Sequence, residues 1–200
     1  MKGKRFTVSP SFFIPLFLLF LGSPPAHALL FFCAVLLHEA GHLIALLSFG
    51  YPPTGLSLSL SGAVLQTRED FIPYKKESAI SLAGPFFGVL GCAAALFSLR
   101  QRFTENGMLF FSFNFLLTLL NLLPIRGTDG GCALFALLCY HGEEWQARKW
   151  TDAIHRVFLT LLYGVSTWLL VKEKNPSLLI LTLSLTAGEA KKRKKATITS

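Results

Sequence analysis

Two histidines four residues apart, with a glutamate directly after the first, are the residues best placed to do chemistry. The segment is His38-Glu39-Ala40-Gly41-His42, an H-E-x-x-H pattern. On a helix, side chains at i and i+4 project from one face, so both imidazoles could bind one metal ion. The glutamate could take a proton from a metal-activated water and later deliver it to a leaving amine. Two imidazoles, a carboxylate and an open coordination position favour zinc.

The surroundings of this pattern strengthen the metal hypothesis. It lies inside an apolar block from about Leu29 to Phe49. Burying three titratable side chains at membrane depth without a partner costs several kcal/mol, and a metal ion would supply that partner. The alternative is a pair of hydrogen-bonded core histidines beside a protonated glutamate.

A third ligand must come from elsewhere in the chain, and Asp129 is the candidate. It is the only acidic residue between Glu105 and Glu143, and Gly127, Gly130 and Gly131 around it permit unusual backbone angles. The alternative interpretation of Asp129 is a turn residue before Gly130.

The composition is that of a membrane protein. The 200 residues are 52% hydrophobic and 15% charged, with a mean hydropathy of +0.52, which ordinary soluble domains do not show. The four cysteines stand singly in apolar runs, without the spacing of a disulfide framework or a CxxC site. The formal charge of +8 comes from basic residues that flank apolar blocks, which predicts membrane topology and no nucleic-acid binding.

The apolar blocks predict an all-α polytopic membrane protein with about six transmembrane helices. After the fourth block the chain breaks at Pro124 and resumes as an apolar piece to about Tyr140; such a break at membrane depth must line a cavity or pack against protein. A loop is expected over 141–152. The first block follows a basic start and precedes a small-x-small pattern, so it could be a cleaved signal peptide, although a retained first helix is favoured. The six blocks are approximately 12–21, 29–49, 78–99, 108–123, 157–171 and 178–185.

Between the second and third blocks the hydrophobic period changes. Leucines alternate with serines from Leu56 to Ser61, which predicts a short β-strand or hairpin at the membrane surface between helices 2 and 3. An exposed strand edge there could capture an unwound substrate by main-chain pairing, and an ordinary interfacial loop is the alternative.

The distribution of basic residues predicts that both termini are cytosolic. With six spans, thirteen Lys and Arg residues fall on the inside and four on the outside. The second and fourth blocks then run in the same direction, and both the histidine pair and the break before Asp129 reach the cytoplasmic half of the bilayer. One membrane-embedded domain is expected over 1–200, with a core at about 29–138 and a basic cytosolic tail at 189–200.

Three sequence pieces together resemble the site-2 protease family, and within it the compact bacterial, sporulation-type branch that lacks PDZ and CBS domains. The first is His38–His42. The second is Asn121-Leu122-Leu123-Pro124 followed by Asp129-Gly130-Gly131, which resembles the family's N-x-x-P-x-x-x-x-D-G element. The third and weaker piece is Ala83-Gly84-Pro85. The resemblance covers about 29–138, roughly half of the chain.

The resemblance implies a zinc metalloendopeptidase. In that family two histidines and an aspartate bind zinc, a glutamate is the catalytic acid/base, and an asparagine helps to position the substrate. Transferred by motif, these roles fall on His38, His42 and Asp129 for Zn²⁺, on Glu39 for catalysis and on Asn121 for substrate positioning.

The chain also departs from the family pattern. Gly88 stands where many members carry asparagine, and Arg126, Gly127 and Thr128 replace the more usual apolar or proline residues before the aspartate. Arg126 could orient substrate carbonyls or extend to the cytoplasmic interface, and the second is favoured. No role is assigned to the three remaining histidines, His27, His141 and His155.

The leading hypothesis is therefore an enzyme of the bacterial inner membrane that performs regulated intramembrane proteolysis. It would hydrolyse peptide bonds of membrane-embedded or membrane-associated proteins near the cytosolic face. Its partners are such substrates and the lipid bilayer. The alternative is a catalytically silent relative that escorts transmembrane helices, or a small transporter. An intact glutamate and a third ligand favour the enzyme, since a binding protein needs neither.

Overall fold

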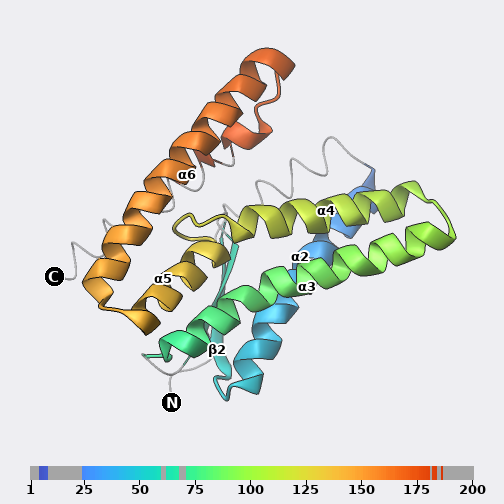
Figure 1. Ribbon diagram of the computed structural model, residues 1–200. Helices are drawn as coiled ribbons and strands as arrows, with labels where there is room; N and C mark the ends of the chain where they lie inside the picture. Colours follow the sequence, from blue (N-terminus) through green and yellow to red (C-terminus); the bar gives the residue numbers. More distant parts are fainter. Residues whose placement is uncertain are drawn as a thin grey trace.

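Helices make up most of the described chain, and one small sheet accompanies them (Figure 1). The computed structural model describes residues 5–8, 24–59, 62–67, 71–180, 182, 183 and 186. The strands are β1 (Arg5–Val8), β2 (Pro53–Ser59) and β3 (Gly62–Thr67). The helices are α2 (Pro25–Ser48), α3 (Tyr74–Gln101), α4 (Glu105–Leu122), α5 (Asp129–His141) and α6 (Glu144–Glu173).

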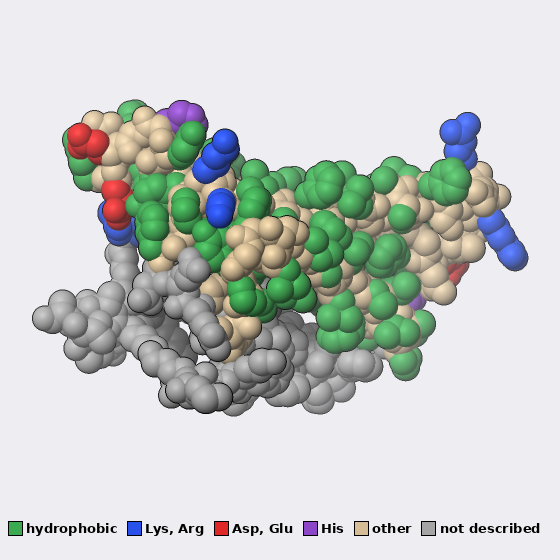
Figure 2. All heavy atoms as spheres, turned by 90° about the horizontal axis from the view of Figure 1, so that it is seen from below, with side chains coloured by type: hydrophobic (Ala, Val, Ile, Leu, Met, Phe, Trp, Pro, Cys, Tyr) green, Lys and Arg blue, Asp and Glu red, His purple; other side chains and the backbone are tan. Residues whose placement is uncertain are grey.

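Three of these helices, α2, α3 and α6, are long and apolar enough to cross a bilayer. Many of their large apolar side chains are exposed, and Figure 2 shows hydrophobic side chains over the middle of the visible face, with charged ones toward its two ends. An apolar belt of this kind suits lipid and not water, so the chain is a membrane protein. The count of six spans stays a prediction, because the first expected block, 12–21, lies outside the described residues, as does the basic tail at 189–200.

Helix α3 is the central element and packs against α2, α4 and α5. Small residues let the backbones approach closely. A Cβ atom added to Gly41 of α2 would collide with the Ala83 carbonyl of α3, and one added to Gly88 of α3 would collide with the Thr118 hydroxyl of α4. Such contacts are the usual means of joining helices in lipid, where burial of apolar surface supplies little driving force.

The sheet has the order β1-β2-β3, so β2 is its central strand. The period-two segment forms β2, which pairs antiparallel with β3 and parallel with β1. The hypothesis that this segment offers an open edge for substrate is therefore wrong: both of its edges are paired, and the outer strands are β1 and β3. Strand β1 was not expected, since a parallel pairing across 50 residues leaves no local signal.

The loop expected over 141–152 is also wrong. Only Gly142 and Glu143 separate α5 from α6, which begins at Glu144. The polar residues of this segment lie on the first turns of a helix, where Arg148 and Glu144 form an ion pair of 2.9 Å at i,i+4 spacing. Helix α6 packs on α5 and extends away from the other helices (Figure 1).

Candidate metal centre

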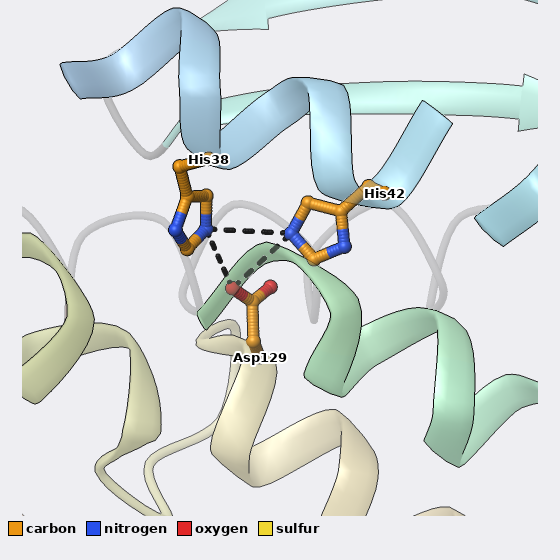
Figure 3. Close-up of side chains that lie close together, drawn as sticks. All are labelled: His38, His42 and Asp129. Carbon is orange, nitrogen blue, oxygen red and sulfur yellow. Dashed lines mark hydrogen bonds and ion pairs between the residues drawn. The ribbon is translucent and has the colours of Figure 1, made fainter. Parts of the chain in front are cut away.

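The side chains of His38, His42 and Asp129 converge between α2 and the first turn of α5 (Figure 3). The Nε2 atom of His38 lies 2.9 Å from Asp129 Oδ2, and the Nε2 atom of His42 lies 3.2 Å from the same oxygen. The two Nε2 atoms are 3.3 Å apart. His38 is only 4% exposed. Residues 91 positions apart thus form one compact donor set, as the predicted topology required.

The hydrogen bond of His42 to the backbone determines which of its two ring nitrogens carries the proton. Its Nδ1 lies 2.8 Å from the backbone carbonyl oxygen of Ile80 on α3. A carbonyl only accepts, so Nδ1 carries the proton and the Nε2 of the neutral ring presents a lone pair to the cluster. The Nδ1 of His38 is also buried, but it has no hydrogen-bond partner among the described residues.

Helix α3 forms one wall of the cluster through Ala83-Gly84-Pro85. A Cβ atom on Gly84 would lie 2.7 Å from His38 Nε2 and would collide with His42 Nε2, so only glycine leaves this space open. Pro85 lies inside α3 and has no N–H to donate to the carbonyl of Ser81, four residues earlier; the neighbouring Ile80 carbonyl, on the same turn, accepts the proton of His42. The motif thus contributes space for the metal-binding atoms and a turn that orients one of them.

The connection between α4 and α5 places Asp129 at the first position of α5, where a helix N-terminus favours a carboxylate. The Thr128 hydroxyl caps this helix by accepting from the Gly131 amide, 3.3 Å away. Gly127 has φ = 90°, in the region that favours glycine. Gly131 packs so closely on the Ile125 carbonyl that a Cβ atom could not be added. This tight turn aims Asp129 back at α2.

The donor set fits a divalent zinc ion. Tetrahedral zinc with bonds of about 2.0–2.2 Å separates its ligand atoms by roughly 3.3–3.6 Å. The three observed separations, 2.9, 3.2 and 3.3 Å, need to widen by only a few tenths of an ångström. Two imidazoles and one carboxylate also match the protein ligands of catalytic zinc sites, which keep a position open for water or substrate.

The two other residues expected at the site lie close to it in the chain. Glu39 follows His38 on α2 and is half-buried. Asn121 lies near the end of α4, and its amide nitrogen donates to the Leu117 carbonyl of its own helix, 3.0 Å away. The amide oxygen and the second N–H are then the groups that Asn121 can offer to a substrate. The catalytic and positioning roles of these residues remain predictions.

Sequence reasoning missed the partners of Arg126. Its guanidinium forms an ion pair with Asp152 of α6, and its backbone N–H donates to Nδ1 of His155, 3.1 Å away. Neither the interfacial nor the substrate-orienting interpretation included these contacts, and His155, which was given no role, is 7% exposed. The available signal was the i,i+3 spacing of Asp152 and His155, which puts both on one face of a helix.

Comparisons with known proteins support the architecture. The sequence matches no protein-family profile and no curated protein. The structure, however, superposes on the site-2 protease from Methanocaldococcus jannaschii with a TM-score of 0.66, covering 96% of this chain and 91% of that one at 19% identity. The chain has a site-2 protease fold. The similarity in fold extends over nearly the whole chain, well beyond the core at 29–138 that the sequence motifs covered.

Proposed function

We propose that this membrane protein is an intramembrane zinc endopeptidase. Its substrates would be membrane-embedded or membrane-associated proteins, cut near the cytosolic face. The convergence of two imidazole nitrogens and one carboxylate oxygen carries the proposal, because these three ligand atoms lie within 4.8 Å of one another and together form a donor set that suits a divalent cation. The site-2 protease fold supports it.

Metal binding, proton transfer and substrate positioning would be carried out by different residues. His38, His42 and Asp129 would hold the metal, and bound zinc would supply Lewis acidity toward water and a peptide carbonyl. The Glu39 carboxylate would accept the proton of the attacking water and pass it to the leaving amine. The amide oxygen of Asn121 would hold a main-chain N–H of the substrate next to the site.

The enzyme would lie in a membrane with a defined orientation. We infer one domain over 1–200 in the bacterial inner membrane, with both termini cytosolic because basic residues gather on that side. A substrate segment must unwind before its peptide bonds can be reached. Among the described strands, β3 is an outer strand of the sheet, and we propose that an extended substrate pairs with this side of the sheet.

The first test is metal analysis of the purified protein beside Asp129→Ala. We expect the wild type to hold one zinc ion and the variant to lose it, since two imidazoles alone bind zinc weakly. Retention of both zinc and cleavage by the variant would overturn the ligand assignment.

The second test is cleavage of a single-span test substrate by Glu39→Gln. Removal of the proton acceptor should lower kcat by about 10²–10⁴-fold, with zinc content and thermal stability unchanged. Glu105→Gln, at the exposed start of α4, is the matched control and should cleave normally. A Glu39→Gln protein that cleaves at the wild-type rate would exclude this catalytic role, and wild-type protein that binds transmembrane helices without cutting them would support the escort alternative.

A further inference from the structure

Helix α6 forms a hydrogen bond and an ion pair with Arg126, a residue of the turn that carries Asp129, three positions before that aspartate. The backbone N–H of Arg126 donates to His155 Nδ1 at 3.1 Å, and its guanidinium pairs with the Asp152 carboxylate. Both partners lie one turn apart on α6. One arginine is therefore held at its main chain and at its side chain by the same helix.

The opposite side of the turn is anchored in the core. Ile125, directly before Arg126, is 1% exposed, and the Thr128 hydroxyl lies 2.7 Å from its carbonyl oxygen. The turn is thus held between the core on one side and α6 on the other. His155 is 7% exposed, so water cannot readily replace its ring as the acceptor for the Arg126 N–H.

The ion pair also determines what the Arg126 charge does. A guanidinium binds carboxylates strongly and in a bidentate geometry. Deprived of Asp152, Arg126 would have Asp129, three residues later, as a carboxylate with which to pair, and that pairing would compete with a metal ion for the same oxygens. In the structure the guanidinium instead pairs with Asp152 on α6.

We propose that Asp152 and His155 are positioning residues for the metal ligand Asp129. His155 fixes the backbone of the turn, and Asp152 keeps the Arg126 guanidinium away from the metal-binding carboxylate. The inference rests on the proposed zinc-dependent function, and it makes α6 part of the metal centre although α6 supplies no ligand.

The test measures zinc affinity by competition with a chelator, on full-length protein in detergent, for His155→Ala, His155→Asn and Asp152→Asn. Loss of a group that orients a ligand typically lowers metal affinity by about 10- to 100-fold. We expect that loss for His155→Ala and Asp152→Asn. His155→Asn should recover most of the affinity, because its amide oxygen lies near the position of Nδ1 and also accepts a hydrogen bond.

The double variant Arg126→Met/Asp152→Asn separates the two roles. Removing the guanidinium together with its partner should restore zinc affinity relative to Asp152→Asn, because nothing then competes for Asp129. Glu144→Ala, which breaks the exposed Glu144–Arg148 pair on the same helix, is the control and should leave zinc affinity unchanged.

A purely structural role for α6 would lower the unfolding temperature of the variants without changing zinc affinity, and that result would overturn the proposal. It would also be overturned if His155→Asn lost as much affinity as His155→Ala, or if the double variant lost as much as Asp152→Asn. Cleavage assays on the zinc-loaded variants should show kcat reduced and KM unchanged. Wild-type protein that binds no zinc would instead refute the proposed function itself.

Discussion

Helices α3 and α6 are both long and apolar enough to cross a membrane, but they contribute to the protein in opposite ways. Within an apolar window of 18 residues, 28% of the residues of α3 are buried. In the corresponding window of α6 the share is only 11%. Helix α3 touches α2, α4 and α5, whereas α6 packs on α5. Among the described residues, most of α6 is thus not covered by other helices, and α3 forms the centre of the helix packing.

The difference arises from the residues at the helix contacts. Glycines on α3 allow neighbouring backbones and imidazoles to approach, and Gly84 does so directly at the candidate metal centre. On α6 the contacts with the Asp129 turn come from longer polar side chains, Asp152 and His155. Glycines let α3 approach its neighbours closely and leave room for a metal ion beside the backbone. Hydrogen bonds from longer side chains allow α6 to hold the Asp129 turn without such close approach.

Three glycine-to-alanine variants test this difference between α3 and α6, and Gly84→Ala is expected to have the largest effect. The added methyl group would occupy the space between the two Nε2 atoms, so we expect zinc affinity to fall by at least about 100-fold and cleavage to be lost. Zinc content by mass spectrometry and cleavage of the single-span substrate are the measurements. An alanine variant with full zinc occupancy would show that α3 does not limit the space at the centre.

An intermediate effect is expected from Gly88→Ala, one turn further along α3. Its Cβ atom would collide with the Thr118 hydroxyl, and overpacking of this kind costs about 1–3 kcal/mol. A lowered unfolding temperature in detergent would report it. Thr118→Ala in the same chain should recover the loss, because it removes the colliding atom; failure of this rescue would argue against the α3–α4 contact.

The smallest effect is expected from Gly164→Ala on α6, the counterpart of the two α3 variants. Among the described residues, no atom lies within 4 Å of a Cβ added there. Alanine is the better helix former by about 1 kcal/mol, so the unfolding temperature should stay the same or rise slightly. Zinc affinity should not change. A loss comparable to that of Gly88→Ala would mean that α6 packs as tightly as α3, and the contrast between the helices would be wrong.

Local patterns predicted most of the helical content. The apolar blocks that begin near Leu29 and Ser78 became α2 and α3, and the break at Pro124 separates α4 from α5 as expected. The start of α6 was missed because its first turns are polar, and a hydrophobicity pattern does not distinguish a water-exposed helix end from a loop. The role of β2 was misjudged because strand order depends on partners distant in sequence.

The three residues of the candidate donor set could be named from the sequence alone. H-E-x-x-H spacing places two imidazoles on one helix face whatever surrounds them, and the scarcity of acidic residues singled out Asp129. Only the tertiary structure decided that Asp129 reaches the imidazoles, that Ile80 orients His42, and that α6 holds Arg126. These three facts join residues between 26 and 91 positions apart. Contacts over such distances follow from how helices pack, and no local spacing encodes them.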